Sequence, residues 1–181
     1  MANQPPNKPA QEPDVEGAIR LLRESSDPQL RQFVAYLLGQ TGDTRAVEPL
    51  IDALQDDNVG VRGAAANALG TIGDDGVIPY LRPLLSHQNP QLIVWTAFAL
   101  TRLGDDHFDT ITQALESDDV DVRRSAILAL RQLGDRRAIG PLIALLGDEE
   151  RRFAADSTVD EAVTQTLVIL GYNIGKLPPR S

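Results

Sequence analysis

Residues 58–74 read NVGVRGAAANALGTIGD, and this stretch decides the fold. Asn58 has a side chain that accepts hydrogen bonds from the free N–H groups at the start of a helix. Gly73 suits the left-handed residue that commonly ends a helix. Valine, alanine and leucine recur between these two residues with helical spacing. The stretch therefore predicts a helix of about 13 residues.

The same pattern occurs five times along the chain. A glycine recurs at intervals of 31, 31, 30 and 37 residues, at Gly42, Gly73, Gly104, Gly134 and Gly171. Fifteen residues before each glycine stands a helix-capping residue: Asp27, Asn58, Asn89, Asp119 or Asp156. A shorter apolar segment precedes each of these helices, and we expect Pro83 to kink the third such segment. The repeat therefore predicts pairs of short helices, which bury their apolar faces only by stacking on one another.

The predicted fold class is all-α, a right-handed α-solenoid of about five helical hairpins. The repeat domain is expected at 15–173, with repeats at about 15–43, 44–74, 75–105, 106–135 and 136–173. Residues 1–14 form a Pro-rich leader and residues 174–181 a tail, and both are expected to be flexible. The segment 147–158, GDEERRFAADST, lengthens the fifth repeat and is interpreted either as a cap of the solenoid or as a docking loop.

The pattern Asp-x-x-Val-Arg-x-x-Ala-Ala-x-Ala-Leu-Gly-x-Ile-Gly-Asp resembles the HEAT-like repeat of the phycobilisome lyases and their relatives. Residues 58–74 match it at every specified position but the first, where Asn58 replaces Asp. The resemblance implies one of two functions. The first is a non-enzymatic adaptor that binds a protein partner in its concave groove, in phycobilisome or photosynthetic assembly, with no cofactor. The second is a phycobilin lyase subunit, or a lyase-related factor, whose substrate is an open-chain tetrapyrrole on phycobiliprotein cysteines. Lyases of this type are complexes of two different subunits, so the second function implies a heterodimer.

The face of each second helix opposite the core is expected to line the concave surface. The residues expected to contact a partner there are Tyr36, Asn67, Val94, Phe98, Arg124, Leu128 and Arg131. Gly60, Gly63 and Gly70 each cost about 1 kcal/mol of helix stability relative to alanine, so we expect them to lower the floor of the groove. The alternative is that tight curvature of the solenoid buries Phe98 and Trp95 against neighbouring repeats.

Three arginines, Arg31, Arg62 and Arg123, share one position of the repeat. In similar repeats this arginine pairs with an aspartate at an adjacent turn, so the resemblance implies a structural ladder of ion pairs along the stack. Ile93 stands at this position in the third repeat and interrupts the ladder.

Composition argues against several other functions. The net charge of the 181 residues is −9, which counts against nucleic-acid binding. Cysteine is absent, and the two histidines, His87 and His107, have no second ligand at helical spacing, so we expect no metal site. We find no phosphate-binding loop, nucleophile elbow or dinucleotide fingerprint, and therefore expect no catalytic residues. Without a long apolar run we expect no membrane insertion and a cytoplasmic protein.

Overall fold

Helices and the turns that join them make up the computed structural model, which describes residues 14–147 and 157–177. The α-helices are α1 (Val15–Glu24), α2 (Pro28–Thr41), α3 (Val47–Ala53), α4 (Val59–Ile72), α5 (Ile78–Leu81), α6 (Pro90–Arg102), α7 (Phe108–Gln113), α8 (Val120–Leu133), α9 (Ile139–Gly147) and α11 (Ser157–Ile169). Short 3-10 helices are η1 (Thr44–Ala46), η2 (Asp75–Val77), η3 (Arg82–Ser86), η4 (Ala114–Glu116), η5 (Arg136–Ala138) and η6 (Ile174–Lys176). The predicted α-solenoid of helical hairpins is confirmed.

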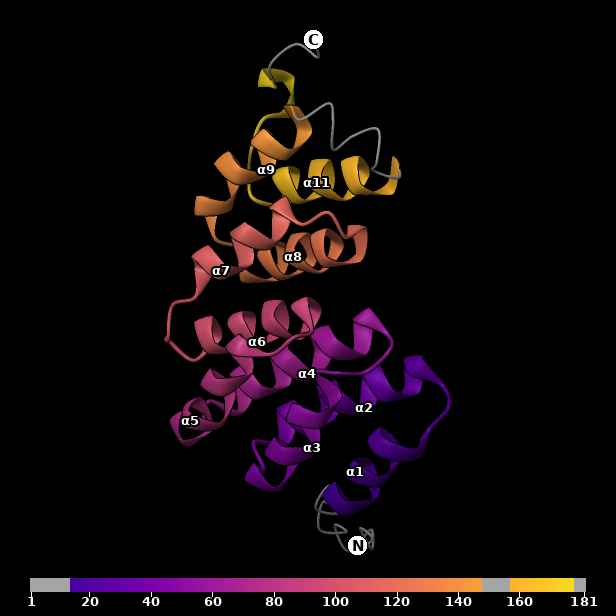
Figure 1. Ribbon diagram of the computed structural model, residues 1–181. Coiled ribbons are helices and arrows are strands. Elements are labelled where there is room, and N and C mark those ends of the chain that lie inside the picture. The colour runs from indigo at the N-terminus through magenta and orange to yellow at the C-terminus, as the bar shows by residue number, and fades with distance from the viewer. Residues whose placement is uncertain (1–13, 148–156, 178–181) are drawn as a thin grey trace, which may run out of the picture.

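The hairpins are stacked in chain order, from α1 and α2 at one end to α9 and α11 at the other (Figure 1). The longer second helices, α2, α4, α6, α8 and α11, contact one another in succession and form one layer of the stack. The shorter helices α3, α5, α7 and α9 lie along the opposite edge (Figure 1). This arrangement makes the layer of second helices the surface on which residues from different repeats can meet.

Local sequence explains where the second helices begin and end. The side chains of Asp27, Asn58, Asn89 and Asp119 each accept a backbone N–H from the first turn of the helix that follows, as predicted. The fifth predicted cap, Asp156, lies outside the described residues. All five repeat glycines have a positive φ, between 65° and 89°, which a side chain would make costly.

Two features of the shorter segments also follow from proline and from capping. Helix α5 ends at Leu81 and passes into the 3-10 helix η3, which contains Pro83, so the predicted kink is confirmed.

An asparagine cap also occurs after the fifth repeat. The side chain of Asn173 accepts a hydrogen bond from the N–H of Gly175 at the start of η6. Regular structure therefore extends past residue 173, where we expected the tail to begin. The expected leader and the segment 148–156 lie outside the described residues.

The core consists of the inward positions of the second helices. One leucine in each repeat is fully buried: Leu38, Leu69, Leu100, Leu130 and Leu167, each 0% exposed. These leucines join one continuous cluster of buried residues that runs through the described part of the chain. Continuity is what a solenoid requires, because each hairpin is too small to bury its own apolar face.

Helix α6, at the centre of the stack, is buried on more sides than we expected. Val94 is 1% exposed and Phe98 0% exposed, so the expectation that these two residues face solvent and contact a partner is wrong. The reason is curvature: α4 and α8, which flank α6, also contact each other directly. Phe98 packs edge to face against Trp95, with ring centroids 5.8 Å apart, and Trp95 is likewise 0% exposed. The alternative of burial by tight curvature is therefore the correct one for Phe98 and Trp95.

Candidate ligand and partner cavity

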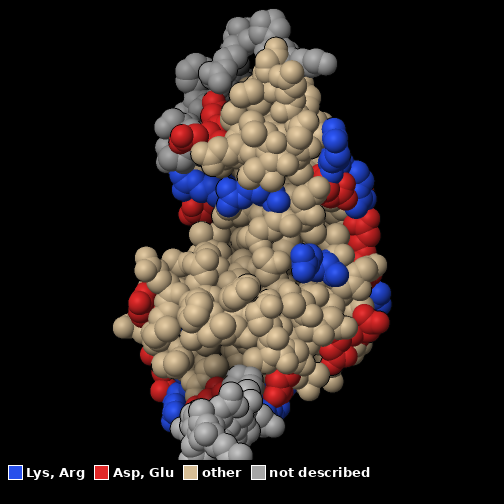
Figure 2. Space-filling view, turned by 180° about the vertical axis from the view of Figure 1, so that it is seen from behind, with Lys and Arg blue, Asp and Glu red and all other residues tan. Residues whose placement is uncertain are grey.

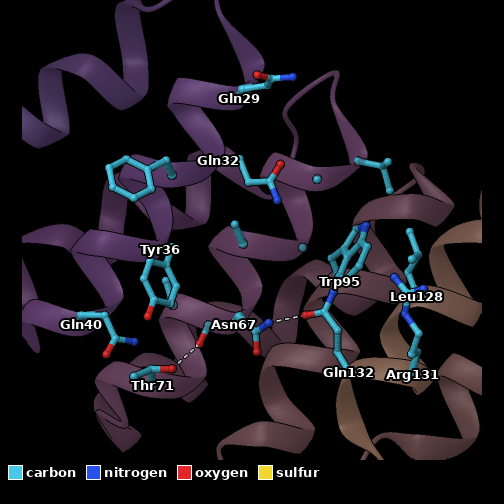
Figure 3. Close-up of a pocket in the computed structure, with 16 residues that line it drawn as sticks. Gln29, Gln32, Tyr36, Gln40, Asn67, Thr71, Trp95, Leu128, Arg131 and Gln132 are labelled. Atoms are coloured by element: carbon cyan, nitrogen blue, oxygen red, sulfur yellow. Dashed lines mark hydrogen bonds between the residues drawn. The ribbon is translucent and has the colours of Figure 1, made fainter. Parts of the chain in front are cut away.

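An open cavity of about 780 Å³ lies on the layer of second helices, between the first two repeats and the fourth. Its lining comes from α2, α4, α6 and α8 (Figure 3). The lining residues are Gln29, Gln32, Phe33, Tyr36, Gln40, Val59, Gly60, Gly63, Ala64, Asn67, Ala68, Thr71, Trp95, Leu128, Arg131 and Gln132. Small-molecule sites in proteins typically have about 300 to 1,000 Å³, so this cavity has the size of such a site.

Two glycines of α4 form part of the floor, as we expected. A Cβ atom on Gly63 would lie 3.0 Å from Cη2 of Trp95 and 3.2 Å from Nε2 of Gln132. A Cβ atom on Gly60 would lie 2.6 Å from Oε1 of Gln32. The third glycine, Gly70, is not among the lining residues, and a Cβ atom there would meet the side chain of Arg102 on α6. All three glycines therefore allow side chains of neighbouring helices to approach α4, and two of them belong to the lining of the cavity.

One end of the cavity is closed by a contact between repeats that are far apart in sequence. The side-chain amide of Asn67 on α4 donates a hydrogen bond to Oε1 of Gln132 on α8, 65 residues away (Figure 3). Thr71 supports this corner by donating from Oγ1 to the carbonyl of Asn67 at 2.9 Å. The indole of Trp95 lies beside this corner, and its buried Nε1 has no hydrogen-bond partner among the described residues.

Aromatic side chains form the side of the cavity contributed by α2. Phe33 and Tyr36 are each 56% exposed, which is high for residues of this size. Leu37 lies on the same helix beside them and is 41% exposed. An apolar strip of this kind on an otherwise charged protein commonly marks a binding surface.

Charge is nearly absent from the cavity. Arg131 is the one charged residue of its lining, and no Asp or Glu lines it, although the chain as a whole carries a net charge of −9. Figure 2 shows a broad uncharged surface with Lys and Arg side chains above it and acidic groups mainly toward the edges. The site therefore favours an uncharged or anionic group over a cation.

Sequence reasoning located part of this site and missed the rest. The structure brings together Tyr36, Asn67, Leu128 and Arg131 at the cavity, while Arg124 is not among its lining residues and instead contacts Asp121 at 3.3 Å. The lining residues that we did not select as contacts include Gln29, Gln32, Phe33, Gln40, Thr71, Trp95 and Gln132.

The missed residues have a signal in the repeat. Phe33, Ala64 and Trp95 each stand nine residues before their repeat glycine, on one flank of the face that we expected to line the concave surface. Thr71 and Gln132 each stand two residues before theirs. The exposed face of the second helices is thus rotated toward that flank. Large or polar residues at these two positions of the repeat indicate this rotation.

Arg31 makes the expected pair with an aspartate of the next repeat. Its guanidinium donates to both carboxylate oxygens of Asp56, at 2.7 and 2.8 Å, and to the carbonyl of Ser25 at 2.9 Å. Burial alone would raise the pKa of Asp56, but the hydrogen bonds from Arg31 and from the backbone of Asn58 outweigh it and hold that pKa below its ordinary value.

The other two arginines of the expected ladder pair differently. Arg62 donates to the carbonyls of Asp56 and Asp57 at 2.7 and 3.0 Å, and Arg123 makes the equivalent bonds to the loop before its own helix. Neither makes an ion pair with a carboxylate within the described residues. For Arg62 the reason is visible in the sequence, because the position equivalent to Asp56 in the next repeat is His87. Of these three arginines, only Arg31 makes the expected ion pair within the described residues, so the expectation is wrong for Arg62 and Arg123.

Within 14–147 and 157–177, no group of three His, Asp or Glu side chains is arranged to hold a metal ion. No helix in the same ranges combines the length and the apolarity needed to span a bilayer.

Comparison with known proteins identifies the repeat. The profile for HEAT repeats matches residues 15–94 and 78–161. The chain belongs to the HEAT-repeat family. A relative named bilin biosynthesis protein PecE, from Mastigocladus laminosus, is 31% identical over 133 residues, which are 72% of this chain and 49% of the relative. Phycocyanobilin lyase subunit alpha of Pseudanabaena tenuis is 41% identical over 156 residues, with coverage of 61% and 58%.

These relatives confirm the resemblance to phycobilisome-lyase repeats. This chain spans about half the length of these two relatives, 49% of the PecE protein and 58% of the lyase subunit. Among solved structures, the complex of CpcE and CpcF of phycocyanin lyase from Nostoc aligns with a TM-score of 0.42 and 20% identity, covering 87% of this chain and 81% of the other.

Proposed function

We propose that this HEAT chain is a lyase-type subunit that holds an open-chain tetrapyrrole in the cavity and acts together with a protein partner in phycobilisome assembly, in the cytoplasm. The relatives named for bilin biosynthesis and for a phycocyanobilin lyase subunit support the ligand class. The word subunit in the second name supports a protein partner. The adaptor function that the resemblance also implied becomes the second candidate.

The observation that carries the proposal is the cavity with exposed aromatic side chains in its wall. Gly60 and Gly63 belong to the lining of the same cavity. Phe33 and Tyr36 are each 56% exposed and offer ring faces to a planar conjugated ligand. Covering these rings would remove apolar area from water, at roughly 25 cal/mol for each Å².

The chemical contribution of the chain is binding and orientation. The lining residues of the cavity include no His, Asp or Glu, so they offer no side chain suited to proton transfer near neutral pH. The chain also has no cysteine, so a thiol for covalent attachment would come from the phycobiliprotein. Holding the tetrapyrrole in one orientation beside that thiol would accelerate attachment by bringing the reactants together.

One observation favours the adaptor function. The apolar strip formed by Phe33, Tyr36 and Leu37 continues along α2, and Leu37 is not among the residues that line the cavity. A protein surface could cover this strip without placing a ligand in the cavity.

The test mixes the purified chain with phycocyanobilin and separates the mixture by size-exclusion chromatography with absorbance detection. We expect the pigment to elute with the protein and to show a red-shifted spectrum. A parallel experiment offers bilin-free phycocyanin subunits carrying an affinity tag. If the pigment elutes apart from the chain while the tagged phycocyanin subunits retain the chain, the adaptor function stands and the tetrapyrrole function is refuted.

A further inference from the structure

Arg131 lines the cavity, and none of the described carboxylates forms an ion pair with it. It is half-buried, and no carboxylate of the described residues lies within 4.0 Å of its guanidinium. Other arginines of the described chain do form such pairs: Arg23, Arg31, Arg45, Arg82, Arg124 and Arg137. A bound anion would supply the partner that this guanidinium lacks among the described residues.

Gln132, the next residue on α8, offers a second donor to the cavity. Gln132 accepts from Asn67 through Oε1, which leaves its Nε2 group available to donate. This Nε2 lies 3.2 Å from the position that a Cβ atom on Gly63 would occupy, at the floor of the cavity. Arg131 and Gln132, neighbours on α8, therefore both offer N–H donors to the cavity (Figure 3).

The lining of the cavity has no acidic side chain that could pair with these donors. The lining contains no Asp or Glu, and its other polar side chains are amides and hydroxyls. A carboxylate accepts two or more hydrogen bonds and pairs with a guanidinium through two parallel N–H bonds. A carboxylate is therefore the group that this end of the cavity complements.

We propose that Arg131, assisted by the amide of Gln132, is the specificity-determining group that binds a carboxylate of a planar conjugated ligand. The body of that ligand lies against the exposed rings of Phe33 and Tyr36. The inference rests on the proposed function, because an open-chain tetrapyrrole with propionate side chains has both parts. Recognition at this end would also fix which end of the ligand points out of the cavity.

The test compares phycocyanobilin with its dimethyl ester, which keeps the conjugated body and lacks both carboxylates. Binding to the full chain is measured by absorbance titration for wild type, Arg131→Gln and Arg136→Gln. Arg136 serves as the matched control, because it is an exposed arginine on η5 outside the lining of the cavity. Far-UV circular dichroism checks that each variant is folded.

We expect the ester to bind wild type roughly tenfold to a hundredfold more weakly than the free acid, the range of a lost charge-assisted hydrogen bond. Arg131→Gln should weaken binding of the acid to a similar degree and should remove the difference between acid and ester. Arg136→Gln should bind both compounds as wild type does. Equal affinity of wild type for acid and ester, or unchanged affinity of Arg131→Gln for the acid, would overturn the role of Arg131 while leaving the proposed function intact. Failure of wild type to bind either compound would overturn both.

Discussion

Substitution by alanine should change the free energy of unfolding strongly at Phe98 and very little at Phe33. Phe98 is 0% exposed on α6, whereas Phe33 is 56% exposed on α2 at the cavity. Replacing a fully buried phenylalanine by alanine typically costs about 3–5 kcal/mol, because the lost burial is joined by a cavity that the surroundings fill incompletely. Phe98→Ala also removes the edge-to-face contact with Trp95 at 5.8 Å. We therefore expect the free energy of unfolding to fall by about 3–5 kcal/mol.

The matched variant Phe33→Ala should change that free energy by no more than about 0.5 kcal/mol, since more than half of its side chain is already in water. A chain of this length shifts its melting temperature by roughly 2–4 °C for each kcal/mol. Phe98→Ala should therefore melt roughly 6–20 °C below wild type, and Phe33→Ala within about 2 °C of it.

The assay is thermal and urea unfolding followed by far-UV circular dichroism, run on both variants under one set of conditions. A loss of less than about 1 kcal/mol for Phe98→Ala, the size of an average point substitution, would refute the burial of α6 between α4 and α8. A loss for Phe33→Ala as large as that for Phe98→Ala would refute the assignment of Phe33 to the open wall of the cavity.

Three further predictions concern packing and charge. Gly39→Ala should destabilise the protein by about 1–3 kcal/mol in urea unfolding, because its Cβ would lie 2.7 Å from a backbone atom of α4. Gly140→Ala should stabilise α9 by up to about 1 kcal/mol, because a Cβ there would have nothing within 4 Å. Equal effects of the two substitutions would contradict the close approach of α2 and α4. Asp56→Asn should cost about 1–3 kcal/mol at neutral pH. The folded-state pKa of this carboxyl is lowered, so the cost should shrink as pH falls below about 4, and a cost that persists at acid pH would argue against the ion pair. A double-mutant cycle with Asn67→Ala and Gln132→Ala should give a coupling of about 0.5–1.5 kcal/mol in unfolding free energy, and additive effects would show that the link between α4 and α8 contributes nothing.

The cavity shows where reasoning from one sequence stops. Tyr36, Asn67, Leu128 and Arg131 were correctly placed on the layer of second helices, because a helical wheel assigns faces from spacing alone. Phe98 was assigned to the same face and is buried. A wheel describes one helix, and it has no information on how sharply the stack bends.

The chain's own sequence determined its helices, because their causes are local. Capping side chains, glycines with positive φ and the kink at Pro83 all act within a few residues, and each of these was confirmed. The tertiary structure alone decided that α4 and α8 meet across α6, through the bond between Asn67 and Gln132. Curvature of a solenoid is the sum of small rotations between neighbouring repeats, and each rotation depends on side chains that pack across an interface. The same curvature buries Phe98 and Trp95 and forms the cavity, because it brings together residues that no local pattern connects.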